Sequence, residues 1–600
     1  MIDYANALSE EQIEICKSKD NLLVKACPGS GKTRTITYKL AYNIENNPDS
    51  LRKLVAITYT NRAADEIRER IEGLGIDTER IWAGTIHQFC LEWILRRFKM
   101  YLPSLACGFK IIDERVKQRY LEDIIAKSGK KIYWGDINTS YTRDLKLTEQ
   151  ESVKRTLIGE YHKKLVQNME LDFDLILALA HNILVKNPFS ATYIKDAIDL
   201  ICIDEYQDTQ DLQYAIIEDI ANAEGHSDLE INFYGDPNQA IYGSLGGIAK
   251  NIVQIQSEFI GNKFKEFTLS GCFRSTQRII DFYKEFMVTT YPIEGRGEIK
   301  NSHGIISYNH TIHKNDIYDY IAKIIKMNID DGIEDKEICV LAPTWMLLFP
   351  FSNELKSRLP NIKFDAPDIT PIKRDPLNLF YNLSRLLLTE PNIRKFNYRK
   401  MVARDILKRL KEMCGDVWRE VDDIELLNIV IKSKVHCEKG SEFIKKGIEL
   451  TMESLGINIQ EVTDLSDMYN DFNEKMEFRL NHKDYCLVDE IGTFKRMFKE
   501  KEGVVINTCH GVKGEEYKTV IAFGLVYSKV PNINIEVAMQ NDEANKLLYV
   551  IASRAKENLY MFSENGRIYW DKGVRGYCEA FPTRQLFQNS NVTYDKVDIE

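Results

Sequence analysis

The stretch NLLVKACPGSGKT runs from Asn21 to Thr33 and decides how the rest of the chain is interpreted. Its first six residues form an apolar run typical of a buried strand, and a Pro/Gly turn follows. The remainder matches the phosphate-loop pattern G-x-x-x-x-G-K-[ST], except that Ala26 replaces the first glycine. Gly29 and Gly31 let backbone N–H groups curve around a phosphate. The stretch therefore predicts a strand, a nucleotide-binding loop and a helix.

The chemistry of this loop predicts how its residues act. Lys32 is placed to reach the β- and γ-phosphates, and the Thr33 hydroxyl is placed to bind Mg²⁺. A helix that begins near Lys32 adds the positive end of its dipole. The residues that we expect to contact the nucleotide here are Pro28, Gly29, Ser30, Gly31, Lys32, Thr33 and Arg34. For the loop taken alone, the alternative is a glycine-rich turn that binds nothing.

Four further apolar runs have the same form as the first. They are Leu54–Thr60, Leu200–Asp208, Glu230–Asp236 and Gly503–Cys509. Continuous apolar strands followed by helical segments indicate a parallel sheet covered on both faces, and ligands bind at the carboxyl ends of such strands. Asp204 is there placed to bind Mg²⁺, and Glu205 to polarise the attacking water. Without the strand and the loop, an Asp-Glu pair would be an ordinary surface feature.

The composition is that of an ordinary globular protein. Of 600 residues, 44% are hydrophobic and 28% are charged. No run approaches the roughly 18 apolar residues of a membrane span, and the first residues do not form a secretory signal. We therefore expect a cytoplasmic protein with no membrane partner. The 12 cysteines form no C-x-x-C pair and no zinc-ligand cluster. A net charge of −10 excludes a bulk polycation but leaves room for a local basic groove.

The order of the motifs resembles that of superfamily 1A DNA helicases of the UvrD, Rep and PcrA type. Eight or more ordered matches make a chance similarity negligible. The motifs that carry the resemblance are LSEEQ (Leu8–Gln12), AITYTNRAADEIRERI (Ala56–Ile71), GTIHQF (Gly84–Phe89), DFDLIL (Asp172–Leu177), IDEYQDTQ (Ile203–Gln210), GDPNQAIYG (Gly235–Gly243), LSGCFRST (Leu269–Thr276), TCHGVKGEEY (Thr508–Tyr517) and KLLYVIASRAK (Lys546–Lys556).

The resemblance implies an α/β protein with two RecA-like parallel-sheet P-loop NTPase domains, each with a mostly helical insertion, and ATP between the two domains. We expect the first RecA-like domain, 1A, to comprise residues 1–90 and 191–268, with insertion 1B at residues 91–190. We expect the second, 2A, to comprise residues 269–374 and 490–600, with a reduced insertion 2B at residues 375–489. Both predicted insertions are charged and helical in pattern.

The same resemblance implies nucleotide contacts outside the loop. Arg274 and Arg554 would be arginine fingers from the second domain, which stabilise transition-state charge on the γ-phosphate. Gln239 would sense that phosphate and pass its state to the DNA-contacting residues. The residues implied at the base and the ribose are Gln12, Phe273 and Glu516. Without the motifs, each arginine would be interpreted as part of a surface ion pair.

Contacts with single-stranded DNA are implied by the same motifs. Non-specific single-strand binding needs phosphate donors and aromatic platforms for bases. The residues implied are Tyr59, Asn61, Arg62, Thr85, His87, Tyr242, Thr508 and His510. Taken alone, the tyrosines are equally compatible with ordinary packing, and the histidines with plain surface positions.

Two departures from the family pattern bear on function. Family members usually have Trp-Arg after the IYG that includes Tyr242, whereas this chain has Ser244-Leu245. A lost base stack, worth roughly 1–3 kcal/mol, would weaken the grip on DNA. Both insertions are short compared with those of housekeeping members. In these respects the chain is similar to the UvrD-like helicase subunit of the Gabija phage-defence system, which works beside a nuclease subunit. No nuclease constellation is visible in this chain.

The sequence leaves three functions open. The first is an ATP- and Mg²⁺-dependent helicase or translocase on single-stranded DNA or DNA ends, with 3′-to-5′ polarity. It would act beside a partner nuclease in phage defence, or alternatively as a DNA-repair helicase. The second is a regulatory ATPase subunit that senses DNA and activates an effector without robust unwinding of its own. An RNA motor is disfavoured, because the TYTNRAA and DEYQD forms are those of the DNA branch.

Overall fold

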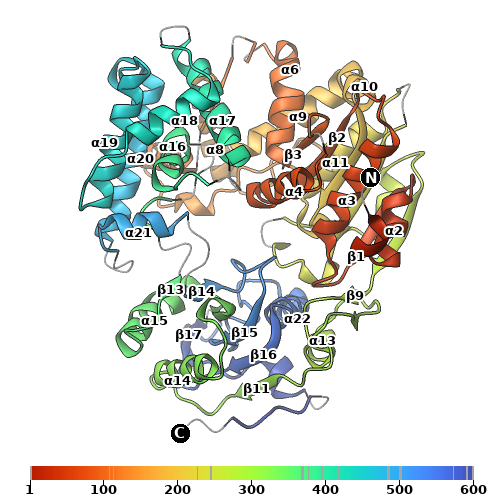
Figure 1. The fold of residues 1–600 in the computed structure, drawn as a ribbon, viewed down its shortest axis with the longest axis vertical. Helices are drawn as coiled ribbons and strands as arrows, with labels where there is room; N and C mark the ends of the chain where they lie inside the picture. The colour runs from red at the N-terminus through yellow and green to blue at the C-terminus, as the bar shows by residue number, and fades with distance from the viewer. Residues whose placement is uncertain are drawn as a thin grey trace. The chain divides into compact units, whose positions relative to one another are not determined.

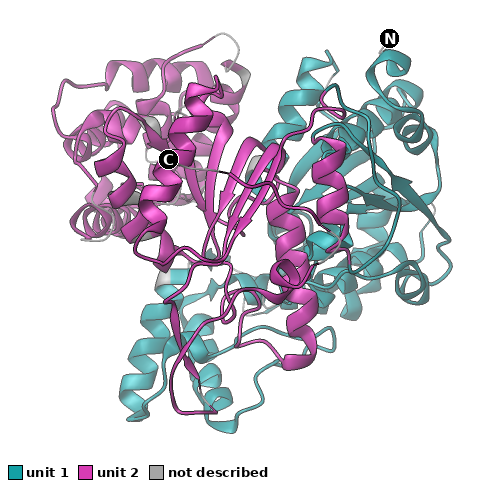
Figure 2. Cartoon of the chain, turned by 90° about the horizontal axis from the view of Figure 1, so that it is seen from below, with its two compact units in different colours: residues 1–274, 288–298 teal, residues 275–287, 299–600 magenta. Residues whose placement is uncertain are grey.

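A computed structural model describes most of the chain, and it divides into two compact units (Figure 2). Unit 1 comprises residues 1–274 and 288–298, and unit 2 comprises residues 275–287 and 299–600. The ranges described are residues 3–76, 78–103, 105–106, 108–112, 114–225, 228–243, 246–365, 370–373, 375, 378–392, 396–415, 418–482, 487–498, 503–571, 573–589 and 592–597.

Unit 1 is built on a six-stranded parallel sheet with the strand order β3-β2-β6-β7-β1-β8 (Figure 1). Its strands are β1 (Asn21–Ala26), β2 (Lys53–Thr58), β3 (Ile81–Thr85), β6 (Ile198–Asp204), β7 (Glu230–Gly235) and β8 (Phe264–Leu269). β6 and β1 are therefore both neighbours of β7. This order brings the ends of three predicted motifs to one edge of the sheet.

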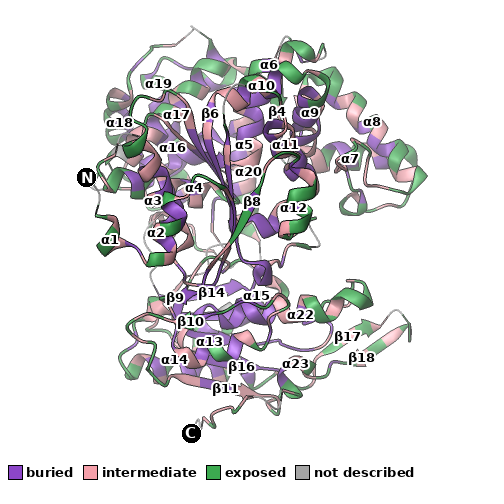
Figure 3. Cartoon of the chain, turned by 90° about the vertical axis from the view of Figure 1, so that its right-hand side faces the viewer, coloured by how far each residue is buried: buried purple, intermediate pink, exposed green. Residues whose placement is uncertain are grey.

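Alternate residues of each inner strand enter two different hydrophobic cores. In β1, Leu23 faces one core, while Leu22 and Val24 face the other. One core is completed by α9 (Phe173–Lys186), α10 (Pro188–Asp196), α11 (Asp211–Ala221) and α12 (Ile252–Glu258). The other is completed by α2 (Glu10–Lys17), α3 (Lys32–Asn46) and α4 (Asn61–Gly73). Burial on both faces explains why the inner strands are continuous apolar runs. The edge strand β8 instead exposes charged residues (Figure 3).

Part of the predicted insertion 1B has a core of its own. It consists mainly of α7 (Glu114–Ser128) and α8 (Ser152–Asn168) and includes Leu121, Ile158 and Tyr161. The strand β4 (Lys110–Ile111) precedes α7, and the strand β5 (Glu170–Leu171) follows α8. The two strands form a short parallel pair. The Tyr161 hydroxyl donates to Asp172, the N-cap of α9, at 2.9 Å. α9 and α10 themselves share the core of the sheet.

Unit 2 has a second six-stranded parallel sheet, with the order β11-β16-β15-β12-β14-β13. Its strands are β11 (Ile305–Asn309), β12 (Ile338–Ala342), β13 (Phe364–Asp365), β14 (Val504–Thr508), β15 (Tyr517–Ala522) and β16 (Ala555–Phe562). The principal helices that accompany the sheet are α13 (Gln277–Lys284), α14 (Ile317–Asp330), α15 (Trp345–Arg358) and α22 (Val537–Ala552).

Between β13 and β14, the chain of unit 2 forms a separate helical layer. Its core is continuous and includes the fully buried Leu383, Ile406 and Ile444. The helices of this layer are α16 (Leu379–Leu388), α17 (Phe396–Cys414), α18 (Asp423–Lys432), α19 (Gly440–Ser454), α20 (Thr463–Asn481) and α21 (Ile491–Arg496). The layer occupies most of the stretch in which the sequence predicts insertion 2B.

The predicted fold class is confirmed: the chain is α/β, with two parallel sheets and many helices. Each of the predicted apolar runs ends its strand where the polar turn begins. β2 ends at Thr58, because the Thr60 hydroxyl accepts the Ala63 N–H and caps α4. β6 ends at Asp204, because Glu205 adopts a left-handed backbone conformation. Among the described residues, no helix has the length and apolar character that a membrane span requires.

Phe233 should be a principal contributor to the stability of unit 1. It is fully buried on β7, with its ring 5.6 Å from that of Phe259 and 5.7 Å from that of Tyr214. Phe233→Ala should lower the free energy of unfolding by about 3–5 kcal/mol, measured by urea denaturation. Phe189→Ala, at a position that is 66% exposed, is the matched control and should change it by less than about 0.5 kcal/mol. Equal losses would contradict this assignment of the core.

Candidate nucleotide site and DNA-contacting residues

The loop between β1 and α3 has the left-handed turns that a phosphate loop needs. Gly29 and Gly31 have φ angles of 75° and 76°, which side chains with a Cβ rarely adopt. A Cβ on Gly29 would also lie 2.5 Å from the Cβ of Arg274. Gly31 is the N-cap of α3 and provides no side-chain cap. The first N–H groups of α3 are therefore available to an anion.

Ser30 gives a second sign that the loop is shaped for a ligand. Its side chain is 2% exposed, and its Oγ has no hydrogen-bond partner in the described part of the chain. A buried hydroxyl without a partner costs about 1–3 kcal/mol. Phosphate oxygens would supply the missing acceptor.

Lys32 is held by Asp204, the last residue of β6, and by Glu205, which follows it. Its Nζ lies 3.0 Å from Asp204 Oδ1 and also contacts Glu205 Oε1. Burial alone would lower the pKa of Lys32, but the two carboxylates raise it above its usual value. Burial raises the pKa of Asp204, which Lys32 opposes. The site thus brings one cation and two carboxylates together at the mouth of the loop.

Glu205 is held in a strained conformation. Its φ of 56° is left-handed, which costs a non-glycine residue of order 1–3 kcal/mol. In this conformation the carboxylate contacts Lys32. Such strain persists where the surrounding structure fixes the residue, and here Gln207 donates its Nε2–H to Glu205.

A chain of hydrogen bonds leads from Glu205 to the predicted γ-phosphate sensor. Gln207 Oε1 accepts the Asp236 N–H at 3.1 Å, and Asp236 Oδ2 accepts from Gln239 Nε2 at 2.9 Å. All these groups are buried except Glu205, which is partly buried. A Cβ on Gly235 would lie 2.1 Å from Gln207 Oε1, so this glycine makes room for the bond. The chain is a geometric link between β6 and β7.

Gln12 is engaged by the protein at both ends of its amide. It occupies the third position of α2, where its Oε1 accepts the Ser9 N–H at 2.9 Å. Its Nε2 donates to the Ser30 carbonyl at 2.8 Å. Gln12 therefore supports the phosphate loop in this structure, and its contact with adenine stays a prediction. Pro28 lies within the loop, and Thr33 and Arg34 lie in the first turn of α3.

Phe273 and Arg274 lie against the loop within unit 1. The Phe273 N–H donates to the Gly29 carbonyl at 2.9 Å, and its ring is 45% exposed. An exposed ring beside the loop is suited to stacking on a base. The chain passes into unit 2 directly after Arg274.

The remaining nucleotide residues that the sequence predicts lie in unit 2. Arg554 is 1% exposed, and its guanidinium donates to the carbonyls of Val550 at 3.1 Å and Glu515 at 3.2 Å. It thereby fixes the backbone next to Glu516, an exposed residue 3.5 Å from Lys556 Nζ. The finger role of Arg554 and the ribose contact of Glu516 stay predictions.

Three of the predicted DNA contacts of unit 1 lie at or just after the ends of the neighbouring strands β2 and β3. Thr58 of β2 pairs with Thr85 of β3, so Asn61 and His87 lie near one edge of the sheet. Asn61 is the first residue of α4, and Thr85 is the N-cap of the short helix α5 (Ile86–Phe89). The side chain of Arg62 lies outside the described residues, as do Ser244 and Leu245.

Two tyrosines form an aromatic platform near the same edge. The rings of Tyr59 and Tyr242 stack with centroids 5.2 Å apart and planes inclined at 20°. Tyr59 is 45% exposed, so one face of the pair is accessible. Burial raises the pKa of both phenols, which keeps them neutral.

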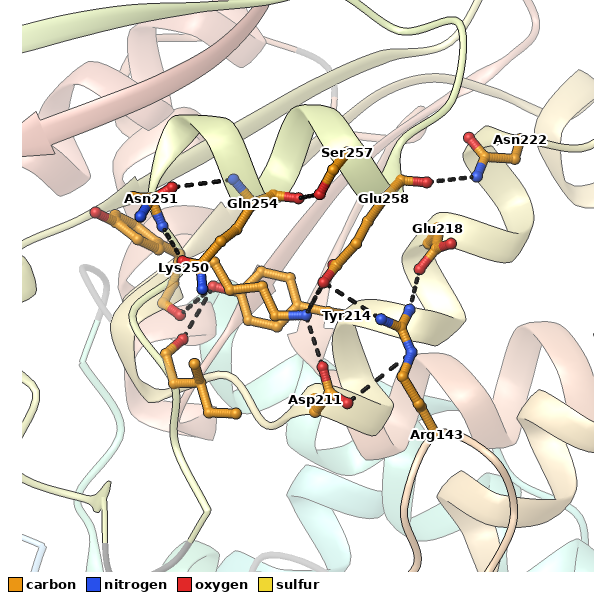
Figure 4. A network of polar contacts seen from close by, with 12 residues as sticks. Arg143, Asp211, Tyr214, Glu218, Asn222, Lys250, Asn251, Gln254, Ser257 and Glu258 are labelled. Atoms are coloured by element: carbon orange, nitrogen blue, oxygen red, sulfur yellow. Dashed lines mark hydrogen bonds and ion pairs between the residues drawn. The ribbon is translucent and has the colours of Figure 1, made fainter.

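The segment that follows Tyr242 is anchored to α11 by a charged network (Figure 4). Lys250 Nζ lies 2.6 Å from both Asp211 and Glu258, and 4.6 Å from the centre of the Tyr214 ring. Arg143, from the loop between α7 and α8, contacts Glu258 at 3.3 Å. The Tyr214 hydroxyl donates to the carbonyl of Tyr206, next to Glu205, at 2.9 Å. The network therefore joins the insertion to the residues that follow β6.

Thr508 and His510 lie at the end of β14 in unit 2. The Thr508 hydroxyl accepts the Gly511 N–H at 3.0 Å and closes a turn. A Cβ on Gly511 would lie 2.2 Å from Asn507 Oδ1, so this turn needs a residue without a side chain. The turn leaves His510 partly exposed.

Sequence reasoning missed several residues of this site. Gln207, Asp236, Asn238 and Tyr291 carry the hydrogen bonds around Glu205 and Gln239. The first three stand in motifs already singled out, and buried polar groups beside catalytic carboxylates are the signal that could have drawn attention to them. Tyr291 stands in no motif.

Comparison with known proteins decides the family. The UvrD/REP helicase N-terminal domain matches residues 8–260, and the UvrD-like helicase C-terminal domain matches residues 395–566. The chain belongs to the UvrD/Rep helicase family. It is an ATP-dependent DNA helicase of the UvrD/PcrA type, and hence an ATP-hydrolysing enzyme, as the motif series predicted.

Relatives from two bacteria are similar over nearly the whole chain. The ATP-dependent DNA helicase PcrA of Staphylococcus epidermidis is 24% identical over 643 residues, covering 96% of this chain and 86% of the relative. PcrA of Staphylococcus aureus is 24% identical over 634 residues, covering 94% and 84%. This similarity agrees with the two matched domains of the UvrD/Rep helicase.

Lys32→Ala should abolish ATP hydrolysis by this helicase. The change removes the cation that neutralises the phosphates and leaves Asp204 and Glu205 facing them alone. ATP turnover and nucleotide binding measure the effect. Lys25→Ala is the control, because Lys25 lies on β1 and pairs with Glu266 of β8 at 2.8 Å, not with Asp204 or Glu205. Retained turnover in Lys32→Ala would show that the loop is misread.

Two histidines of this helicase should affect stability with opposite pH dependence. Burial lowers the pKa of His87 to about 4. The unfolded chain takes up this proton from about pH 6.5 downward, so His87 destabilises the fold between about pH 6.5 and 4. Burial also opposes charge on His181, but its bond to Asp219 raises the net pKa above the usual value. Its contribution is therefore complete below about pH 6.5 and is lost as pH rises through the folded pKa.

His87→Gln and His181→Gln test this difference. Urea denaturation at several pH values should show that His87→Gln reduces the loss of stability on acidification. His181→Gln should cost most stability at low pH and least at high pH. Parallel pH profiles for both variants and the wild type would contradict these assignments.

Proposed function

We propose that this helicase couples ATP hydrolysis to movement along single-stranded DNA, with the 3′-to-5′ polarity that the resemblance implies. One observation carries the proposal: the accessible stack of Tyr59 and Tyr242 lies in the same unit as the phosphate loop, and Tyr242 follows Gln239 by three residues. A base stacks on a free aromatic face with roughly 1–3 kcal/mol. The γ-phosphate sensor and the base platform are therefore parts of one short segment.

The residues at the loop account for the hydrolytic step. Nucleotide phosphates replace the carboxylates as partners of Lys32, which releases Glu205 to orient water and accept its proton. Thr33 and Asp204 would supply oxygen ligands for Mg²⁺, which would offset the charge of the phosphates. Two protein ligands suffice, because Mg²⁺ usually keeps waters and phosphates in its shell.

Several of the predicted DNA contacts of unit 1 are neutral groups. His87 is uncharged near pH 7, because burial lowers its pKa to about 4. Thr85, Asn61 and His87 would therefore contact the DNA backbone through hydrogen bonds, while Tyr59 supplies the stack. Such contacts hold DNA of any sequence, and Arg62, whose side chain lies outside the described residues, would add a charged contact with a phosphate.

A second function, a DNA-sensing ATPase that activates a partner nuclease, is favoured by one observation. Ser244 and Leu245 stand where family members usually have Trp and Arg, so one base stack and one phosphate contact are missing. The short insertions point the same way, towards a motor controlled by a partner, as in the Gabija system. DNA repair is the alternative role for a helicase that acts alone.

Displacement of streptavidin from biotinylated oligonucleotides separates these functions. A 3′-to-5′ motor removes streptavidin from the 5′ end only, and single-stranded DNA should stimulate its ATPase. Hydrolysis stimulated by DNA without displacement of streptavidin from either end would contradict the motor function and favour the DNA-sensing ATPase. Robust unwinding by the purified chain, with no partner recovered alongside it, would sink the sensor.

Tyr59→Ala should weaken single-stranded DNA binding by roughly tenfold or more, because it removes the accessible face of the platform. Fluorescence anisotropy with a labelled oligonucleotide measures this, and ATP turnover without DNA should stay unchanged. Tyr193→Ala is the matched control: Tyr193 is also 45% exposed, but its ring packs against Phe98. Equal affinity in Tyr59→Ala and the wild type would remove the platform from the proposal.

A further inference from the structure

The chain of this helicase passes between its two units three times within a short stretch (Figure 2). It leaves unit 1 after Arg274, returns at Val288, and leaves again after Glu298. The returning segment, residues 288–298, carries β10 (Glu294–Gly295), which pairs with β9 (Gly271–Cys272). Any signal that unit 1 sends along the backbone towards unit 2 must pass through one of these crossings.

Asn238 holds the first residues of the returning segment. Its side chain is fully buried and its Oδ1 accepts the N–H of Val288 at 2.9 Å and of Thr289 at 2.8 Å. Its Nδ2 donates to the Thr289 carbonyl at 2.9 Å. A side-chain amide carries a carbonyl acceptor and an NH₂ donor in one planar group. Asn238 thus fixes the backbone where the chain enters unit 1.

The same short helix, η5 (Pro237–Gln239), carries the predicted γ-phosphate sensor. Asp236, its N-cap, accepts from Gln239 Nε2 at 2.9 Å, from the Asn238 N–H at 3.0 Å and from the Tyr291 hydroxyl at 2.7 Å. Tyr291 belongs to the returning segment, so Asp236 is a second tie to it. Through Gln207, the Asp236 N–H is also linked to Glu205.

We propose that Asn238 is a positioning residue that transmits the state of the nucleotide from Glu205 and Gln239 to the chain crossing at Val288, with Asp236 and Tyr291 as its supports. The inference rests on the proposed function of the loop as an ATP site. Asn238 is not among the residues that we expect to contact the nucleotide, and its side chain bonds to the backbone of Val288 and Thr289. It acts by holding the backbone that leads into unit 2.

The burial of this network explains why it would switch between discrete states. Each polar group has a partner, and leaving one buried group unpaired costs about 1–3 kcal/mol. A change at Gln239 that rotates η5 must therefore re-pair all three Asn238 bonds together or break them together. Coupling through bonded networks with two arrangements is the physical basis of communication between sites.

Hydrogen exchange of the returning segment tests the proposal without DNA. The probe is ADP with aluminium fluoride and Mg²⁺, compared with the nucleotide-free protein. In the wild type, exchange of a peptide spanning residues 286–292 should change about tenfold on probe binding, as expected when hydrogen bonds of ordinary strength are made or lost. In Asn238→Ala, exchange should be fast in both states and independent of the probe.

Asn222→Ala is the matched control. Asn222 also donates from its side chain to a backbone carbonyl, that of Glu258 at 2.9 Å, but it does not belong to the chain of bonds from Glu205. This variant should keep the wild-type response. Tyr291→Phe removes one hydroxyl and retains the ring, so it should show a smaller change in the same direction. It carries the test if Asn238→Ala does not fold.

A functional measurement accompanies the exchange data. In Asn238→Ala, nucleotide affinity should stay within about twofold, while the number of nucleotides moved per ATP falls several-fold, because an interaction outside the nucleotide site is lost. No probe-dependent exchange in the wild type, or a full response retained in the variant, overturns the inference. If the wild type shows the exchange response but never moves along DNA, the proposed function fails and the inference stands.

Discussion

The ammonium group of Lys32, held between Asp204 and Glu205, is the interaction on which the site depends. Removing three charges from water is costly, and the cost is tolerable because the cation and the two anions compensate one another. The N–H groups at the start of α3 and the buried Ser30 hydroxyl are also placed to donate to an anion. The site is therefore suited to exchanging a carboxylate partner of Lys32 for phosphate.

Strand order determines how this exchange can be felt elsewhere. β7 lies between β6 and β1, so the turn after β7 stands beside both the acidic pair and the phosphate loop. Gln207, which follows β6, accepts the N–H of Asp236, which follows β7. Gly235 leaves the space that this hydrogen bond needs. The Lys250 network anchors the other side of the same segment through Tyr214 and Asp211. Tyr242 thus lies between two points that polar contacts fix, Asp236 before it and Lys250 after it.

The sequence predicts those parts of the fold that depend on local pattern. Apolar runs buried on both faces predicted the parallel strands, and glycines with left-handed φ angles mark the loop. The partners of Gln207 and Asn238 could not be predicted, because residues 207 and 236, or 238 and 288, become neighbours only through the strand order and the chain crossing. The pattern of the sequence also did not show which helices of residues 91–190 would pack on the sheet. α9, with the sequence FDLILALAHNILVK, is apolar enough to join the core of the sheet.

The stack of Tyr59 and Tyr242 and the polar network around η5 both belong to unit 1, and both bear on the action of a motor. Tyr59 and Tyr242 satisfy each other by stacking, so a base gains only the outer face of the pair unless the rings separate. Separation requires Tyr242 to move, and Tyr242 is three residues from Gln239 and four from Asn238. A nucleotide-driven change in η5 would therefore alter the grip on a base and the crossing at Val288 in one step. With Ser244 and Leu245 in place of Trp and Arg, this platform would carry more of the coupling in the proposed motor than it would if both were present.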